Sequence, residues 1–433
     1  MKIKKKLDGG LKKLLIFFLF FIFSSKNIYG SQILDYETEK FINEIIEKII
    51  EVNGINKKIR FRINSNNEIN AFVDTYNIIN INSGLILYCS DYVALLSVLA
   101  HEVGHIDLNH IQIRKKTIQT NKKYNSLGLL SVIAGSSLVK DPGLLQGSII
   151  TTAALSNKYI SFTKDQEMEA DLYALKTLDL LNTNSESIIE LLQTIDQKLL
   201  ENNFSKSNQR VSTHPYIEDR ILLIKNFQYN KSGNFDINFN ERFNFIKAKF
   251  VGYSDNSDVL KKLNEPYKTY AESIKIARNG NLKMSLRSLN EIIRNNQNSF
   301  LLETKADILF SHGYTKEAVQ FYKKNLEKHP NNYYAQIRIF ENINIGSLSN
   351  YEALIIFEKN KGLLYKYYNN KNILIKYNEL AKKLNKKDWI QFFKFIFTIH
   401  DIDNDIFESK INYFKNTKDY DLLKLINIIQ NIS

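Results

Sequence analysis

The sequence predicts an α+β chain in two parts: a mostly helical domain with a small sheet, then an all-α solenoid of helical repeats. Three observations support this prediction. Apolar residues recur at helical spacing through most of the 433 residues. Short β-type runs are confined to residues 59–82. A repeat of 34 residues can be recognised in the second half of the chain, at 299–332.

The composition is that of an ordinary globular protein with a mild basic bias. Apolar residues make up 44% and charged residues 24% of the chain, whose 433 residues suffice for two or three domains. The net charge is +13, and residues 1–30 contribute +6 of it, so about +7 is spread over the remainder. Basic residues do not form a block interleaved with aromatic ones, so no nucleic-acid partner is predicted.

Residues 1–30 have the pattern of an export signal. A lysine-rich stretch precedes the apolar run Leu14–Phe23, and a polar segment ends at Gly30, a small residue suited to cleavage before Ser31. The apolar run is short for a membrane span, although an uncleaved anchor is the alternative. The single cysteine, Cys89, allows no intramolecular disulfide and is expected to be a buried small apolar residue. Export without disulfides indicates a bacterial periplasm, with membrane association left open.

A first domain, which carries the chemical motifs of the chain, is predicted over residues 31–228, after the signal peptide of 1–30. A helix is expected over 35–52, and the turn Ser83-Gly84 is expected to close the last of three strands. Ser90 is the predicted N-cap of a helix that carries a His-Glu motif. The remaining elements predicted here are strands at 59–63, 69–75 and 77–82, and helices at 162–182, at 185–203 and from about 216 onward.

Residues 126–156 form a weakly charged apolar stretch, split by Lys140-Asp141-Pro142-Gly143 into halves too short to cross a bilayer. We expect two helices, or a helix and a mobile loop, beside the active site. A lid that makes peripheral contact with a membrane is the alternative.

The second half of the chain is predicted to be a repeat domain. Residues 229–257 are rich in Asn, Ser and Asp, which indicates a linker, and the repeats are placed at 258–433. Residues 299–332 fit the 34-residue tetratricopeptide pattern, and 266–298 follow the same plan, with Gly280 at the place of Gly313. The rest is helical in pattern but degenerate. Further helical hairpins are expected there, because such repeats bury their apolar faces only against neighbours.

The predicted chemistry centres on His101-Glu102-Val103-Gly104-His105. Two histidines four residues apart lie on one face of a helix, so both imidazoles can bind one Zn²⁺ per chain while Glu102 reaches a water at the metal. His101 and His105 are therefore candidate ligands, and Glu102 is the candidate general base and later proton donor. Gly104 is costly in a helix interior and suggests close approach of another backbone.

A hydrolytic zinc site needs a third protein ligand, and Glu167 is the candidate. Glu167 and Asp171 are four residues apart on a predicted helix and share a face, whereas Glu169 points away. Asp171 is expected to hold a ligand histidine through its other ring nitrogen. Ala170 would let the two helices pack closely.

Two further histidines are considered. His110 is five residues past His105, about 140° away around a continuous helix, and is expected to be structural. His214 precedes Pro215 in a loop, so it could stabilise an oxyanion, occupy the open position on zinc, or be structural.

These motifs together resemble the zinc peptidases related to HtpX, Oma-type and BepA proteins, most of all the BepA type. The resemblance covers about residues 35–227, and it includes Arg220. Its motifs are Asn70-Ala71-Phe72, Ser83-Gly84-Leu85, Leu99–His105, Glu167–Asp171 and Ser212–Pro215.

The resemblance implies a gluzincin-type fold in which His101, His105 and Glu167 hold zinc and Glu102 carries out catalysis. It also implies that Asn70, Ala71 and Phe72 bind extended substrate, that His214 caps the zinc, and that 126–156 act as a lid.

The predicted function is that of a periplasmic zinc endopeptidase for misfolded or stalled envelope proteins, chiefly those of the outer membrane. The repeats would recruit clients or the outer-membrane assembly machinery. The alternative is a chaperone-like adaptor that works through its repeats and keeps a latent zinc site.

Overall fold

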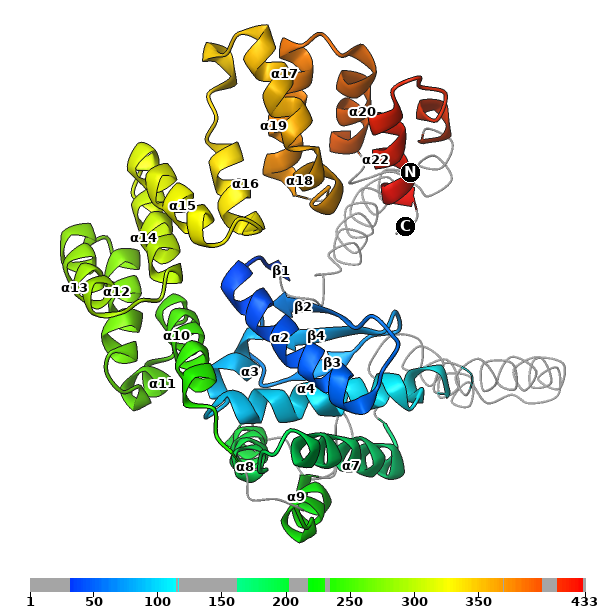
Figure 1. Ribbon diagram of the computed structural model, residues 1–433, viewed down its shortest axis with the longest axis vertical. Helices are drawn as coiled ribbons and strands as arrows, with labels where there is room; N and C mark the ends of the chain where they lie inside the picture. Colours follow the sequence, from blue (N-terminus) through cyan, green and yellow to red (C-terminus); the bar gives the residue numbers. More distant parts are fainter. Residues whose placement is uncertain are drawn as a thin grey trace, which may run out of the picture. The chain divides into compact units, whose positions relative to one another are not determined.

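The computed structural model describes residues 32–113, 116, 162–201, 217–229, 234–368, 370–398 and 411–430. These residues fall into two compact units that divide between Leu263 and Asn264 (Figure 1). The described part is mostly helical with one small sheet, so the α+β prediction is confirmed at this level. No helix among the described residues is long and apolar enough to cross a bilayer. The predicted signal at 1–30, the apolar stretch 126–156 and the motif at 212–215 lie outside the described residues.

The first unit contains a four-stranded sheet in the order β1-β2-β4-β3. Strand β2 is parallel to β4, and both outer strands are antiparallel to their neighbours. Burial in the inner strands is continuous rather than alternating: Ile79 to Asn82 of β4 are all buried, and β2 is buried at its end, Ile63 and Asn64. The strands are β1 (Gln32–Ile33), β2 (Arg60–Asn64), β3 (Ala71–Val73) and β4 (Ile78–Asn82).

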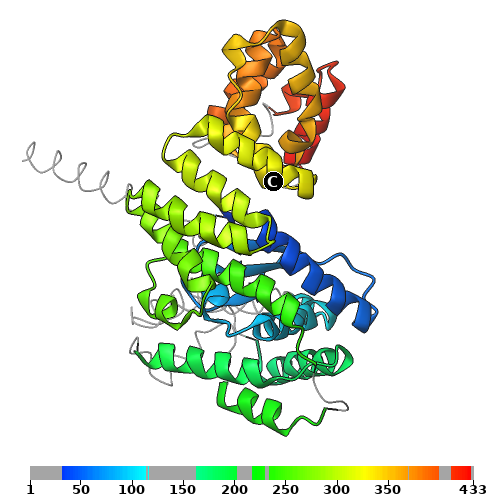
Figure 2. The same cartoon turned by 60° about the vertical axis from the view of Figure 1, so that its left-hand side comes forward.

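Helices cover the sheet and build a second layer beneath it (Figures 1 and 2). Helix α4 packs against β3 and α2 on one side and against α7 and α8 on the other, so it is the central element of the unit. Helix α9 packs on α7 and α8. The helices are α2 (Tyr36–Asn53), α3 (Ser83–Tyr88), α4 (Tyr92–Asp107), α7 (Lys164–Leu180), α8 (Glu186–Glu201) and α9 (Ile217–Asn226).

Two local predictions at the start of these helices were wrong. Ser83-Gly84 does not close a turn but begins helix α3. The N-cap of α4 is Asp91 rather than Ser90, since the Asp91 carboxylate accepts hydrogen bonds from the Val93 and Ala94 amides. Cys89, between these helices, is fully buried as predicted.

The linker predicted at 229–257 is also contradicted over most of its length. Helix α10 (Ile237–Tyr253) occupies it, packs on α2, α3 and α4, and belongs to the first unit, as does α11 (Ser257–Lys262). The many Asn and Asp residues suggested a linker, but the segment also has a buried apolar stripe at helical spacing, formed by Phe239, Phe243, Ile246 and Phe250. Buried Lys249 also ties α10 to the start of α2, 2.8 Å from Asp35 Oδ2.

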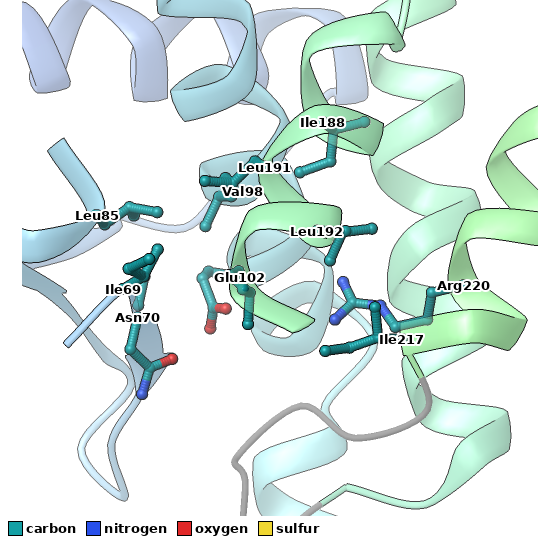
Figure 3. A pocket seen from close by; sticks show the side chains of 12 residues that line it. Ile69, Asn70, Leu85, Val98, Glu102, Ile188, Leu191, Leu192, Ile217 and Arg220 are labelled. Atoms are coloured by element: carbon teal, nitrogen blue, oxygen red, sulfur yellow. The ribbon is translucent and has the colours of Figure 1, made fainter. Parts of the chain in front are cut away.

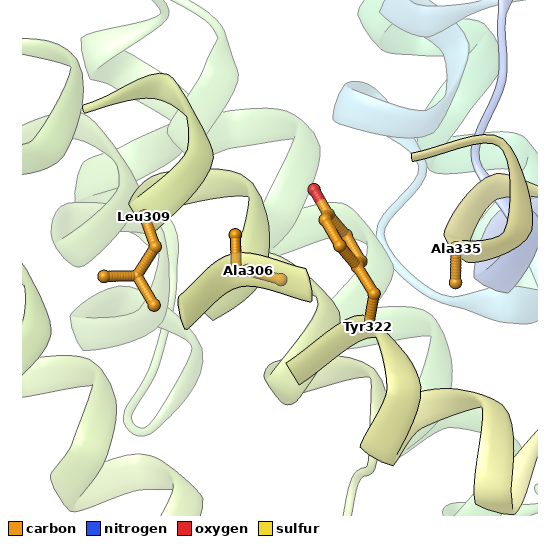
Figure 4. Packing of buried hydrophobic residues seen from close by; sticks show 5 residues of the cluster. Ala306, Leu309, Tyr322 and Ala335 are labelled. Atoms are coloured by element: carbon orange, nitrogen blue, oxygen red, sulfur yellow. The ribbon is translucent and has the colours of Figure 1, made fainter. Parts of the chain in front are cut away.

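The second unit is entirely helical over the residues described. Helix α12 pairs with α13, and α14 pairs with α15, and α15 also packs on α16. Ala306, Leu309, Tyr322 and Ala335 are buried together between α14, α15 and α16 (Figure 4). Gly280 and Gly313 occupy equivalent turns with φ of 88° and 83°, a left-handed conformation that favours glycine. The assignment of these hairpins to tetratricopeptide repeats stays a prediction.

The helices of the second unit continue to the end of the described chain. Helix α19 packs on α16, α17, α18 and α20. The bounds are α12 (Tyr267–Arg278), α13 (Leu282–Asn295), α14 (Phe300–Ser311), α15 (Thr315–Lys328), α16 (Tyr333–Glu341), η3 (Ile345–Ser347), α17 (Asn350–Lys359), α18 (Lys361–Lys366), α19 (Lys371–Lys383), α20 (Lys387–Thr398) and α22 (Tyr420–Gln430).

Candidate metal centre

Three side chains from two helices converge in the interior of the first unit. His101 and His105 project from α4, and Glu167 projects from the first turn of α7. His101 Nε2 is 3.1 Å from His105 Nε2 and 3.5 Å from Glu167 Oε2, and His105 Nε2 is 3.7 Å from Glu167 Oε1. All three residues are buried, and together they could hold a metal ion.

The spacing of these atoms can be compared with what zinc requires. Ligand atoms about 2.1 Å from a tetrahedral zinc lie roughly 3.4 Å from one another. The two imidazole nitrogens are 3.1 Å apart, and each lies near that value from one oxygen of Glu167, at 3.5 Å from Oε2 and 3.7 Å from Oε1. Two imidazole nitrogens and one carboxylate are also a donor set typical of hydrolytic zinc. The residues present therefore fit such an ion.

Close packing of α4 on α7 brings the cluster together. A Cβ at Gly104 would lie 3.1 Å from Cβ and Cγ of Tyr173, so the glycine lets this tyrosine approach α4. The sequence predicted a close backbone at this point, but the neighbour is a side chain. Ala170, on the same side of α7, is fully buried. Helix α7 begins at a capping box, in which Thr163 and Gln166 exchange hydrogen bonds, and this fixes the turn that carries Glu167.

Glu102 follows His101 on α4 and lines a small pocket next to the cluster. Figure 3 shows its carboxylate between Asn70 on the strand side and the side chains of α8 and α9. Ala71, the first residue of β3, also lines this pocket, whereas Phe72 does not. The opposite wall comes from α8 and α9 and is mostly aliphatic, with the guanidinium of Arg220 beside Ile188, Leu191, Leu192, Ile195 and Ile217.

A buried ion-pair network surrounds the other ring nitrogen of His101. Asp171 Oδ1 is 2.8 Å from His101 Nδ1. Arg220 on α9 donates two hydrogen bonds of 2.8 Å to Asp171, one to each carboxylate oxygen. Burial raises the pKa of Asp171, but the charges of Arg220 and His101 outweigh it and lower the pKa to about 2. Asp171 is therefore ionised at neutral pH and accepts from His101.

The pKa of His101 reflects the same network. Burial and the charge of Arg220 lower this pKa, whereas Asp171 and Glu167 raise it, and the net direction is upward. The sequence motifs predict no role for Arg220. The contact of Arg220 with Asp171 cannot be predicted from the residues around either one, because the two are 49 positions apart in the sequence.

The surroundings of His105 differ from the sequence prediction. His105 Nδ1 is 3.0 Å from Nδ1 of His110, and His110 Nε2 is 2.9 Å from Glu169 Oε2. His110 was expected to point away because the projection assumed a continuous helix. Helix α4 ends at Asp107, and Asn109 adopts a φ of 59°, so the chain changes direction before His110. An asparagine near the end of the helix was the signal available in the sequence.

His110 is buried, and burial is the largest influence that lowers its pKa, while Glu169 opposes the shift. Phe162 stacks on the ring of His105 with the centroids 3.7 Å apart. His214, the remaining candidate site residue, lies outside the described residues.

The comparisons with known proteins point to a peptidase. Residues 37–228 match the model of peptidase family M48. This part of the chain therefore resembles a domain of peptidase family M48, in agreement with the resemblance drawn from the motifs.

The chain is similar, in particular, to the "Beta-barrel assembly-enhancing protease" of Escherichia coli strain K12. The two are 26% identical over 218 residues, which cover 49% of this chain and 43% of that protein. The protein of the same name from Yersinia pestis is 25% identical over 188 residues, which cover 43% of this chain and 38% of the relative. The chain thus matches less than half the length of these relatives.

Proposed function

We propose that the first unit is a zinc-dependent endopeptidase. The observation that carries this proposal is the buried cluster of His101, His105 and Glu167, whose ligand atoms all lie within 4.8 Å of one another, with Glu102 on the same helix beside a pocket. The match of residues 37–228 to peptidase family M48 supports it.

His101, His105 and Glu167 would hold the ion. Zinc, when bound, supplies a Lewis acid that polarises a peptide carbonyl and makes water acidic near neutral pH. Glu102 then acts as general base: its carboxylate takes the proton of the attacking water and returns it to the departing amine. Asp171 and Arg220 keep the His101 ring in one orientation, because Asp171 accepts from Nδ1 and Nε2 is left to face the cluster.

The pocket indicates what kind of polypeptide would be cut. The aliphatic wall formed by α8 and α9 favours an apolar substrate side chain next to the scissile bond. Asn70 and Ala71 line the pocket at the start of β3 and would align the substrate, with Phe72 as their continuation in that strand. Folded proteins bury apolar side chains, so misfolded or stalled chains are the fitting substrates.

We place this activity in the periplasm and assign it to the quality control of outer-membrane proteins. The placement rests on the signal pattern of residues 1–30, and the substrate class on similarity to the beta-barrel assembly-enhancing protease. The helical hairpins of the second unit, taken as tetratricopeptide-like repeats, would recruit clients or assembly machinery. His214, by its loop position before Pro215, is proposed to occupy the open side of the metal in a resting state.

The test is Glu102→Gln in the full mature chain, beside Glu47→Gln on the exposed face of α2 as a matched control. Loss of the general base should lower casein cleavage by at least about a hundredfold, with bound zinc unchanged. The control should cut like wild type. Undiminished cleavage by the Glu102 variant would refute the assigned role.

The alternative function is that of a chaperone-like adaptor. It is supported by the separate second unit, which is built of paired helices. It predicts that Glu102→Gln still supports outer-membrane protein assembly in cells, whereas deletion of residues 264–433 abolishes that support. The peptidase proposal predicts that both changes impair it.

A further inference from the structure

The two candidate histidine ligands are held in different ways. His101 presents its second ring nitrogen to a carboxylate, Asp171 Oδ1, at 2.8 Å. His105 presents its second nitrogen to another imidazole, that of His110, at 3.0 Å. His110 in turn contacts the Glu169 carboxylate at 2.9 Å. His110 therefore lies between a ligand and a carboxylate, where ligand histidines usually contact the carboxylate, a carbonyl or water directly.

The contacts of His105 and His110 indicate where the proton of each neutral ring would lie with a metal bound. His105 Nε2 faces His101 and Glu167, so it must offer a lone pair to the ion, and the proton of the neutral ring is on Nδ1. This Nδ1–H donates to His110 Nδ1, which must accept and carries no proton. The proton of His110 is then on Nε2, from which it donates to Glu169. Only this arrangement satisfies both contacts with neutral rings.

The surroundings hold this series of contacts in place. The His110 side chain is only 2% exposed, whereas that of Glu169 is 61% exposed, so the carboxylate end of the series meets solvent. Phe162 stacks on His105 with an interplanar angle of 13° and restricts rotation of that ring. The left-handed backbone of Asn109 turns the chain so that His110 faces back toward α4.

We propose that His110, supported by Glu169, is a positioning residue for the metal: it fixes the tautomer and orientation of His105 and thereby tightens metal binding. The inference rests on the proposed metal site and extends it. His110 touches neither the ion nor the substrate, so its effect appears in metal affinity before it appears in turnover.

The experiment measures zinc affinity of the metal-free full mature chain by competition with a chromophoric chelator. His110→Phe keeps the ring volume but cannot accept a hydrogen bond, and it should weaken zinc binding roughly 10- to 100-fold. His110→Asn places its amide oxygen at the position of Nδ1, so it should retain most of the affinity. Glu169→Ala should cause a smaller loss than His110→Phe. His312→Phe, in the second unit, is the matched control and should bind like wild type.

The outcomes separate this inference from the proposed function. If the wild type takes up no zinc at one equivalent, the proposed function fails. If the wild type binds and His110→Phe binds equally well, or if the Phe and Asn variants are weakened alike, the positioning role is wrong.

A measurement on the wild type covers the case in which His110→Phe does not fold. Nitrogen-15 spectra of the zinc-loaded protein should show the His110 proton on Nε2. A proton on Nδ1 of His110 would overturn the inference.

Discussion

Replacement of Arg220 by methionine tests the buried network behind His101. The arginine side chain is 8% exposed and donates two hydrogen bonds of 2.8 Å to Asp171. Methionine has a similar length and no charge, so it removes the pairing with little change in volume. We expect the pKa of Asp171 to rise from about 2 toward or above its ordinary value of 3.8.

The magnitude follows from this pKa. A folded-state value of about 2 against 3.8 in the unfolded chain stabilises the native state by about 2 kcal/mol at neutral pH. Because the folded pKa is depressed, this contribution is complete above about pH 4 and disappears as the pH falls through about 2. Roughly half of it is gone at about pH 3. Arg220→Met should therefore destabilise the protein by about 2 kcal/mol or more near pH 7, and by about 1 kcal/mol less near pH 3.

Urea unfolding of the metal-free chain at both pH values measures this effect. Far-UV circular dichroism reports both units, whereas the fluorescence of Trp389, the single tryptophan of the chain, reports helix α20 of the second unit. Only the circular dichroism transition should shift. Arg60→Met, at an exposed arginine of β2, is the matched control. An equal loss at both pH values, or a shifted Trp389 transition, would refute the reasoning.

Three further changes have defined outcomes. Gly84→Ala should lower the free energy of unfolding by more than about 2 kcal/mol in urea titrations, because its Cβ would overlap the carbonyl oxygens of Asn67 and Glu68; a loss below about 0.5 kcal/mol would contradict this. Phe243→Ala should cost about 3–5 kcal/mol in the circular dichroism transition and leave Trp389 fluorescence unchanged, since α10 belongs to the first unit. Treatment with a chelator should abolish casein cleavage and lower the melting temperature, and added zinc should restore both; cleavage that survives complete metal removal would exclude a metal-dependent peptidase.

The elements around the site were predictable from the sequence where the signals are local. Residues 35–52 and 185–203 carry clear apolar stripes, and helices α2 and α8 formed there. The failures have equally local causes. Polar residues between the buried apolar ones made α10 look like a linker. The N-cap of α4 is Asp91 and not the expected Ser90, because the Asp91 side chain accepts hydrogen bonds from the first turn. The average composition of a segment predicts a loop or a helix only approximately, because the few side chains that become buried decide which one forms.

The histidine spacing by itself determined that His101 and His105 share one face of α4, because helical periodicity is a property of the backbone. The tertiary structure decided what supports each imidazole. Arg220 reaches Asp171 from a separate helix, and His110 reaches His105 only because the helix ends and the backbone turns at Asn109. Such contacts depend on where distant segments pack and where a helix ends, and a repeating pattern along the sequence contains neither.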